Sequence, residues 1–408
     1  MSDEVQVQKQ NFEDVPVFGA PDASSVAQIL RCRHGGHAVG AALMADHHKG
    51  YSQPIGGVVA YENAVSPSGV GYDIACGNKA VLTDMHARDL KRVIVRVMDE
   101  IWKRIEFGVG RHNTQPPDHE LYDDPTWRDV KPLEKLKNLA YEQLGTVGSG
   151  NHYVDLFEDE QGRVWIGVHF GSRGFGHKTA TGFLNLAQNR DFGAHLREAG
   201  MDADPTVLPL NSSVGQDYLA AMKLAGRYAY AGRDAVCTQV LKILGAKPLE
   251  EIHNHHNFAW EEEHRGRKVL VVRKGATPSF PGQRSFVGGS MGDISVILEG
   301  VDTPEARESF YSTVHGAGRV MSRTEAAGKK RWGKGGRSGG KITRRMMMGW
   351  VEEAGVELRG AGTDESPHCY KRLPDVLKSH GPTIKVLHTL KPLGVAMAGE
   401  DEFDPYKD

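Results

Sequence analysis

The sequence predicts a protein of the α+β class, in which helices and several strands alternate irregularly along 408 residues. Residues 87–105 carry apolar side chains at helical spacing, and three short runs of β-branched residues are typical of strands. No regular βαβ succession connects them, which argues against a doubly wound sheet. Hydrophobic residues make up 39% of the chain, enough for the core of one large domain or two moderate ones.

Each of these elements follows from local spacing. The helix at 87–105 places one apolar face at i, i+3, i+4 spacing, formed by Leu90, Val93, Ile94, Val97, Ile101 and Ile105. A second long helix is predicted over residues 213–244, which are rich in alanine. Strands are predicted over residues 164–169, 268–273 and 294–299, each ending at or near a glycine-rich or histidine-bearing turn.

Charge and cysteine usage give only broad limits. The net charge of −2 does not indicate a polyanionic partner, so a nucleic-acid site would have to be a local basic patch. No segment approaches the roughly 20 apolar residues of a membrane helix, and the N-terminus lacks the apolar core of a signal peptide. The four cysteines are too scattered to form a disulfide framework: Cys32, Cys76, Cys237 and Cys369. We therefore expect a cytoplasmic protein without a membrane partner.

Glycine and histidine, at 49 and 19 residues, gather in short segments that can carry chemistry. In the first segment Asp73 and Cys76 lie three positions apart on a glycine-flanked turn, a spacing that can present two donors to one metal. Taken alone, a buried core cysteine and a turn aspartate are the better interpretation. His152 and His169 each lie where a predicted strand meets a glycine turn, and either can be a hydrogen-bonded structural residue.

Another segment, IHNHHN at 252–257, is dense in imidazole and amide groups. Alternate strand residues face the same way, so His256 and Asn254 could line a site, although such a tract can also be a surface loop. Together with the preceding donors this predicts one transition-metal site made of Asp73, Cys76, His152, His169 and His256. These donors suit zinc well, and manganese with help from carboxylate and water oxygens, so the spacing does not choose the metal.

Two further glycine-rich turns predict a phosphate or nucleotide site. His315 is followed by Gly316, Ala317, Gly318 and Arg319; a neutral imidazole can attack phosphorus, and the arginine could neutralise a phosphate. In isolation, a tight turn with a capping arginine is an equally good interpretation. The turn at 288–293, GGSMGD, can form an anion-binding nest of backbone amides, but it lacks the lysine and spacing of a P-loop.

Read in order, several segments resemble the signature segments of the RtcB family of RNA-splicing ligases over about residues 30–400: GVGYDIACG, GSGNHYVDL, VHFGSRGFGH, HHNFAW, GGSMGD, VHGAGRVMSR and DESPHCYK. The segment 42–58, ALMADHHKGYSQPIGGV, looks like that family's entry segment. The resemblance implies a single large domain over 1–408, with several β-sheets, flanking helices and a central metal and nucleotide cleft.

The resemblance also implies residue roles. Cys76 would bridge two Mn²⁺ ions, completed by Asp73, His152, His169 and His256, and His315 would be the guanylated nucleophile. Arg173 matches a residue that would contact RNA phosphate, and Arg319 is predicted to contact phosphate from its place after the glycine turn. The positions that match the family's GMP site are Asn151, Asp155, Gly289, Ser290, Met291, His315, Gly316, Ala317, Gly318 and Tyr370.

The implied activity is GTP- and Mn²⁺-dependent joining of RNA 3′-phosphate or 2′,3′-cyclic phosphate ends to 5′-hydroxyl ends. The RNA would be tRNA halves or cleaved RNA, and a helper protein such as archease stays open. Three positions depart from the family pattern. Met397 lies near the place of a C-terminal lysine that contacts the guanylate, Asp155 replaces a glutamate, and Gly288 replaces a proline.

Two segments lie outside these motifs. Residues 328–341, GKKRWGKGGRSGGK, are predicted to form a mobile basic loop, which could instead track an RNA backbone and stack a base on Trp332. The acidic tail at 400–408 is expected to fray. Two other functions compete with a ligase: an RtcB-like metal-dependent phosphatase, cyclic phosphodiesterase or RNA-end-binding protein, and a zinc hydrolase unrelated to RNA.

Overall fold

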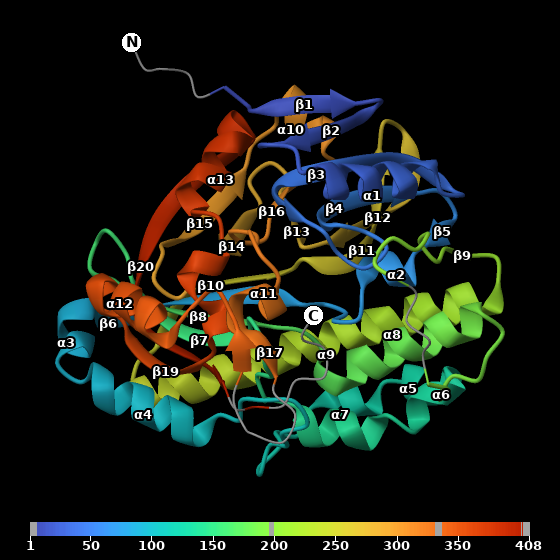
Figure 1. The fold of residues 1–408 in the computed structure, drawn as a ribbon. Coiled ribbons are helices and arrows are strands. Elements are labelled where there is room, and N and C mark those ends of the chain that lie inside the picture. The colour runs from blue at the N-terminus through green and yellow to red at the C-terminus, as the bar shows by residue number, and fades with distance from the viewer. Residues whose placement is uncertain (1–5, 196–199, 331–336, 401, 403–408) are drawn as a thin grey trace.

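The computed structural model describes residues 6–195, 200–330, 337–400 and 402. Two large sheets organise this part of the chain (Figure 1). The first has six strands in the order β1 (Lys9–Phe12), β2 (Val15–Phe18), β3 (Ala38–His48), β4 (Ile55–Tyr61), β12 (Arg267–Lys274) and β11 (Asn257–His264).

The second sheet has eight strands. Its order is β10 (Pro248–His255), β6 (Gly77–His86), β8 (Arg163–Phe170), β7 (Tyr153–Glu158), β20 (Ile384–Gly399), β15 (Ser295–Gly300) and β14 (Arg284–Val287), with β19 (Glu357–Ala361) beside β20. All these pairings are antiparallel except β19 with β20. Three small two-stranded sheets complete the strands: β13 (Ala276–Pro278) with β16 (Ser312–Val314), β17 (Gly328–Lys330) with β18 (Arg337–Gly339), and β5 (Ala64–Val65) with β9 (Leu208–Pro209).

The helices cover the outer faces of these sheets, and the longest, α9 (Ser213–Leu244), runs along the lower side of Figure 1. The other helices are α1 (Ala23–His34), α2 (Pro67–Val70), α3 (Ala87–Lys91), α4 (Ile94–Arg104), α5 (Thr126–Asp129), α6 (Lys131–Glu134), α7 (Lys137–Gln143), α8 (Arg173–Ala187), α10 (Pro304–Glu308), α11 (Arg323–Ala327), α12 (Arg344–Ala354) and α13 (Leu373–His380). Short 3₁₀ turns occupy Glu120–Asp123, Thr363–Glu365, Pro367–Cys369 and Gly381–Thr383. Among the helices of the described residues, none is long and apolar enough to cross a membrane.

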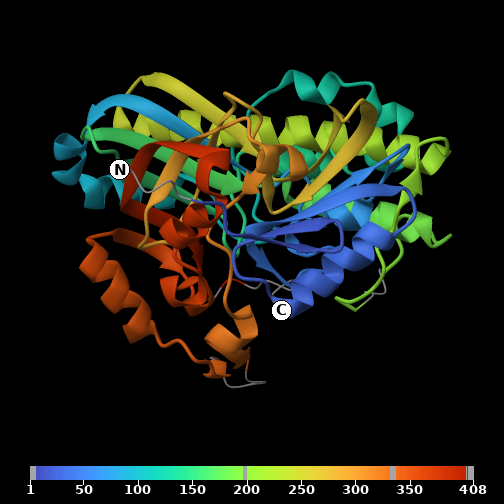
Figure 2. The same ribbon diagram turned by 90° about the horizontal axis from the view of Figure 1, so that it is seen from above.

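The central strands of each large sheet are buried on both faces, and their side chains alternate between separate cores. In β4, Val59 packs in the core shared with α8 and α9, whereas Val58 and Ala60 pack in the core shared with β15 and α13. In β8, Ile166 faces α4 and α9, whereas Trp165 faces α12. The sheets are therefore inner layers, and Figure 2 shows the helices wrapped around them.

The α+β class and the irregular alternation of elements are confirmed. The strands predicted at 164–169, 268–273 and 294–299 are β8, β12 and β15 to within one residue at each end, and the helix at 213–244 is α9. The helix predicted over 87–105 is wrong as a continuous element, because α3 ends at Lys91 and α4 begins at Ile94. The amide of Val93 bonds the carbonyl of Leu90, a tight turn that keeps both flanking apolar faces on one core.

Part of the basic segment lies within the described residues. Its ends pair as β17 and β18, in contrast to the predicted loop, and residues 331–336, including Trp332, lie outside the described residues. In the acidic tail, the carboxylate of Glu402 pairs with Arg111 and its amide bonds the carbonyl of Gly399. Residues 401 and 403–408 lie outside the described part of the chain.

Candidate metal centre and active site

The predicted metal donors meet where the two large sheets join. His256 lies directly between β10 of the second sheet and β11 of the first, so it sits at that junction. Cys76 immediately precedes β6, and the pairing of β6 with β8 sets Gly77 opposite Phe170, which brings the thiol beside His169. His152 immediately precedes β7, which pairs with the other edge of β8. Hydrogen bonding between strands thus assembles donors that are far apart in sequence.

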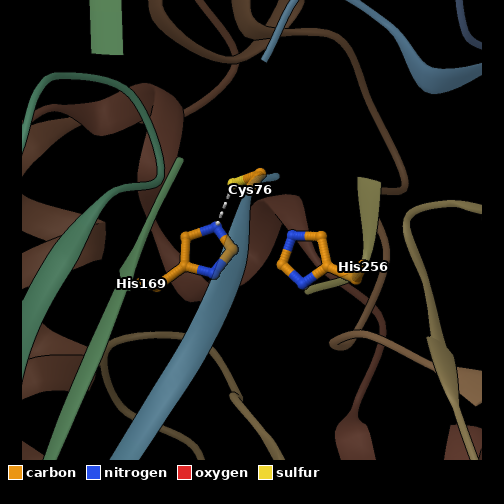
Figure 3. Close-up of side chains that lie close together, drawn as sticks. All are labelled: Cys76, His169 and His256. Carbon is orange, nitrogen blue, oxygen red and sulfur yellow. Dashed lines mark hydrogen bonds between the residues drawn. The ribbon is translucent and has the colours of Figure 1, made fainter. Parts of the chain in front are cut away.

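The donors form two groups that share one residue. The candidate ligand atoms of Cys76, His169 and His256 all lie within 4.8 Å of one another, and so do those of Asp73, Cys76 and His152. The thiol sulfur of Cys76 lies 3.6 Å from Nε2 of both His152 and His169. Figure 3 shows the rings of His169 and His256 on either side of this sulfur. A thiolate common to two donor groups suits a bridging position between two metal ions.

Hydrogen bonds behind two of the histidines fix which ring nitrogen faces the centre. Nδ1 of His169 donates to Oδ1 of Asn78 over 2.6 Å, and the amide of Asn78 in turn donates to the carbonyl of Phe286. Nδ1 of His152 donates to the carbonyl of Val147 over 3.0 Å. Nε2 of His169 therefore carries a lone pair toward Cys76, which is the arrangement of a metal-ligating histidine. Nε2 of His152 lies 3.1 Å from Oδ2 of Asp73 and can donate to it, a proton that a bound metal ion would replace.

The electrostatics of the centre also fit a cation. Burial lowers the pKa of His169 and of His256 well below the ordinary value, so both rings are neutral. Burial and the neighbouring Asp73 carboxylate raise the pKa of the Cys76 thiol. Burial opposes ionisation of Asp73, but hydrogen bonding and charge from His152 lower its pKa to about 2. A bound dication would offset the cost of an ionised thiol beside a carboxylate.

His256 supplies the test of whether a metal fits. Its ring is 2% exposed, and its Nδ1 is buried without a hydrogen-bond partner among the described residues. A buried imidazole nitrogen without a partner costs free energy unless a ligand satisfies it. The donor set and this nitrogen together fit a transition-metal pair, and the mixed thiolate, imidazole and carboxylate ligands leave the choice between zinc and manganese open.

His315 lies next to this centre and is held by Asp46. The ring centroids of His315 and His256 are 4.8 Å apart. Nδ1 of His315 donates to Oδ2 of Asp46 over 2.7 Å, and the backbone amides of His315 and Gly316 donate to the same oxygen. Burial opposes ionisation of Asp46, yet hydrogen bonds from the ring and the backbone of His315 keep the pKa of Asp46 below its ordinary value. Nε2 of His315 is thereby left with a lone pair that can act as a nucleophile.

A cavity of about 870 Å³ opens from these residues, large enough for a nucleotide with part of a second substrate. His315 and every other position predicted to hold GMP line it: Asn151, Asp155, Gly289, Ser290, Met291, Gly316, Ala317, Gly318 and Tyr370. Gly318 illustrates why glycine is needed here. Its φ is +77°, and an added Cβ would lie 2.1 Å from the carbonyl oxygen of Asp46, so any side chain would displace the loop that carries His315.

One end of the cavity is apolar with an isolated carboxyl. Asp155 is 6% exposed, and its Oδ1 has no hydrogen-bond partner in the described part of the chain. Burial raises the pKa of Asp155 well above its ordinary value. Met291, Val395 and Met397 line the cavity with it. A ligand with N–H groups would satisfy this carboxyl.

The two arginines predicted to contact RNA phosphate occupy different surroundings. Arg319 lines the cavity, but its guanidinium bonds the hydroxyl of Tyr370 and the carbonyl of Asp364 and pairs with Glu365. Arg173 lies behind the glycine turn before His152, where it bonds Thr146 Oγ1 and the carbonyl of Gly108. Phosphate contact by either residue stays a prediction.

Sequence reasoning missed three polar residues of the site. Asp46 lies within the ADHHKG segment, but no local spacing links it to a histidine 269 positions later. Asn78 follows Cys76 by two positions, and the alternation of strand side chains is a signal that could have found it. Lys274 lines the cavity and donates to the carbonyls of Tyr51 and Ser68, while burial lowers its pKa to about 8. It directly follows the predicted strand at 268–273.

Comparisons with known proteins identify relatives of this chain. The family model described as tRNA-splicing ligase RtcB matches residues 28–130 and 126–398. The chain is 32% identical to the tRNA-splicing ligase RtcB of Archaeoglobus fulgidus, with 88% of each chain covered. It is 33% identical to the RNA-splicing ligase RtcB of Escherichia coli, covering 86% of this chain and 88% of that protein. It is 31% identical to the tRNA-splicing ligase RtcB of Thermococcus kodakarensis, covering 87% and 86%.

Proposed function

Because this chain belongs to the RtcB family of tRNA-splicing ligases, we propose that it joins RNA 3′-phosphate ends to 5′-hydroxyl ends through a guanylated His315. The reaction would use GTP and two Mn²⁺ ions. The RNA would be tRNA halves or cleaved RNA, and ends that carry a 2′,3′-cyclic phosphate would first be opened to the 3′-phosphate.

One observation carries this proposal. The imidazole of His315 lies beside the donors centred on Cys76, and Asp46 fixes its Nδ1 proton so that Nε2 has a free lone pair. A nucleophile held next to a candidate two-metal site is what phosphoryl transfer requires. The cavity that contains both groups is large enough for a nucleotide.

The chemistry proceeds by three displacements at phosphorus. Nε2 of His315 attacks the α-phosphorus of GTP, and an N–P bond forms as pyrophosphate leaves. An oxygen of the RNA 3′-phosphate then displaces His315, and the 5′-hydroxyl finally displaces GMP as the new phosphodiester forms. When bound, the two Mn²⁺ ions supply positive charge that stabilises the phosphoryl oxygens in these displacements.

The protein's own residues orient these steps. Asp46 keeps the proton on Nδ1 of His315 and stabilises the positive charge that develops on the ring after attack. Cys76 belongs to both donor groups and would therefore be a ligand that the two ions share. The turn with Gly289 and Ser290 lines the nucleotide side of the cavity, and the unpartnered carboxyl of Asp155 would accept from the N–H groups of the base.

Labelling with α-³²P-GTP in the presence of Mn²⁺ tests the nucleophile. We expect the wild-type chain to acquire label and the His315→Ala variant to acquire none. His388→Ala is the matched control, because His388 lies on β20 and pairs with Glu160, away from the cavity. Persistent label in His315→Ala would refute the assignment of the nucleophile.

A second function is favoured by Met397, which lines the cavity near the place of the family's lysine. Without that cation the nucleotide could bind too weakly for ligation, leaving a metal-dependent phosphatase, a cyclic phosphodiesterase or an RNA-end-binding protein. Gel assays with 3′-phosphate RNA distinguish these outcomes. Removal of the phosphate or retention of the RNA, with no GTP-dependent joining, would favour the second function.

A further inference from the structure

Arg233, in the middle of α9, is fully buried and uses its guanidinium as a four-way hydrogen-bond donor. Nη1 donates to the carbonyls of Ala75, over 3.1 Å, and Phe170, over 2.5 Å. Nη2 donates to Nδ1 of His255 over 2.9 Å, and Nε donates to Nε2 of His253 over 2.7 Å. These acceptors are two carbonyls and two imidazoles, and none of the four is a carboxylate.

Three of these four acceptors directly adjoin a metal donor in the sequence. Ala75 precedes Cys76, Phe170 follows His169, and His255 precedes His256. The three donors themselves are the residues drawn in Figure 3, and they come from three separate segments of the chain. The guanidinium of Arg233 therefore bonds a residue adjacent to each of the three donors, Cys76, His169 and His256.

The Asp73–Cys76 turn has a conformation that needs such support. Ala75 has a φ of +60°, which is unfavourable for a residue with a Cβ. Its carbonyl accepts from Arg233, and its amide donates to the carbonyl of Asn257, one residue after His256. The strained turn is thus held on one side by Arg233 and on the other by the residue that follows His256.

The chemistry of the side chain explains why arginine occupies this position. Burying a cation without a carboxylate partner is costly, and apolar side chains usually serve stability better. A planar fork with five N–H groups can reach several fixed acceptors at once, whereas a lysine ammonium is a single point. The cost is understandable if the arrangement of the acceptors matters more than the stability of the fold.

We propose that Arg233 is a positioning residue that sets the mutual placement of Cys76, His169 and His256, and through them the affinity for a pair of divalent cations. This inference rests on the proposed two-metal function. It concerns a residue of α9 that itself supplies no metal ligand.

Metal titration of the full-length Arg233→Lys variant tests the proposal. Mn²⁺ binding is followed by the electron paramagnetic resonance signal of free Mn²⁺, and Co²⁺ binding by thiolate-to-cobalt absorption. We expect affinity for at least one Mn²⁺ ion to fall tenfold or more, and the cobalt absorption of Cys76 to change. Circular dichroism shows whether the variant is folded.

Arg273→Lys is the matched control. Arg273 is equally buried, but its guanidinium bonds Glu262, Ser312 Oγ and the carbonyl of Phe310, and none of these adjoins a residue of the two metal-donor groups. We expect it to lower stability and to leave metal affinity and cobalt absorption unchanged. An equal loss of metal affinity in both variants would overturn the specific role of Arg233.

His255→Phe covers the case in which Arg233→Lys does not fold. The ring of His255 stacks on Tyr230 at a centroid distance of 4.0 Å, so phenylalanine keeps the stacking and removes the Nδ1 acceptor of Arg233. We expect a smaller loss of metal affinity, in the same direction. The proposal is overturned if a folded Arg233→Lys variant binds metal with wild-type affinity. If that variant does not fold, wild-type metal affinity in His255→Phe overturns it instead. A wild-type chain that binds neither metal would instead refute the two-metal function, and this inference with it.

Discussion

Nδ1 of His315 donates a hydrogen bond over 2.7 Å to Oδ2 of Asp46, a residue 269 positions earlier in the chain. The same carboxylate oxygen accepts the backbone amides of His315 and Gly316, so it fixes both the ring and the loop that carries it. Asp46 is 0% exposed and lies on β3 of the six-stranded sheet, whereas His315 directly follows β16. His315, the proposed nucleophile, is therefore oriented from the buried interior of the first sheet.

This relationship predicts that Asp46→Asn slows nucleotidylation of His315 by about 10²- to 10⁴-fold. Asparagine has the same shape but carries no charge, so it cannot stabilise the positive ring that forms on attack. The rate of adduct formation is measured by intact-mass spectrometry after mixing with GTP and Mn²⁺. Asp14→Asn, an exposed carboxylate paired with Arg33, should react at the wild-type rate. A rate for Asp46→Asn within twofold of wild type would contradict the role given to Asp46.

Much of the candidate metal centre could be predicted from the sequence, because its residues lie in short motifs that combine glycine with histidine or cysteine. Local spacing indicated the turn of Asp73 and Cys76 and the strand ends at His152 and His169. It could not establish that Cys76 belongs to both donor groups, because that follows from the pairing of β6, β8 and β10. Partners such as Asp46 depend wholly on tertiary structure.

For the fold, too, features set by local sequence were predicted and features set by tertiary structure were not. Long segments such as α9 and the β-branched strands were predicted closely, because the residue types that favour each element follow one another within a single stretch of sequence. The break between α3 and α4 was not, because the apolar spacing of Leu90, Val93 and Ile94 continues through it. A tight turn can preserve the apolar face of a segment while interrupting its helix, and periodicity alone does not reveal that.

Cys76→Ala should abolish the stabilisation of the folded chain by Mn²⁺. A ligand present at 100 times its dissociation constant stabilises the native state by about 2.7 kcal/mol. Loss of the donor shared by both groups should reduce this shift to near zero, measured by thermal unfolding with and without Mn²⁺. Cys237→Ala is the control, because Cys237 is also buried but belongs to neither group. The idea fails if Cys76→Ala keeps the full Mn²⁺-dependent shift.

His380 predicts a loss of stability on acidification. Burial lowers its pKa from 6.5 to about 4 against the attraction of Asp46, so the native ring stays neutral while the unfolded ring takes up a proton. Between pH 4 and 6.5 the unfolded state binds more protons, and stability therefore falls as the pH falls through this window. The loss is at most about 3 kcal/mol.

The variant His380→Phe isolates this contribution. Phenylalanine can keep the stacking on Phe18, whose ring centroid lies 4.7 Å from that of His380, while removing the titrating group. Urea unfolding between pH 4 and 7 should show a shallower pH dependence of the unfolding free energy. The dependence should not vanish, because His48 has a similarly lowered pKa of about 4. An unchanged slope in the variant would rule out His380 as a contributor.

Met397→Lys should sharpen the preference for GTP over ATP. Met397 pairs with Tyr153 across β20 and β7, and Asp155 lies two residues further on the same face of β7. A lysine there would place an ammonium near the buried carboxyl, favour its ionised form, and offer a donor to the O6 acceptor that guanine has and adenine lacks. One charge-assisted hydrogen bond of about 1.5–3 kcal/mol corresponds to a tenfold or greater change in the ratio of nucleotides accepted.

The ratio of guanylated to adenylated His315, read from intact mass after mixing with equal GTP and ATP, measures this selectivity. Met397→Leu is the appropriate comparison, because it keeps an apolar side chain of similar size at a site that is 5% exposed. Its ratio should match that of the wild type. If Met397→Lys also gives the wild-type ratio of guanylated to adenylated His315, the base does not bind at this end of the cavity. The hydrogen-bond partner of the Asp155 carboxyl must then be another ligand.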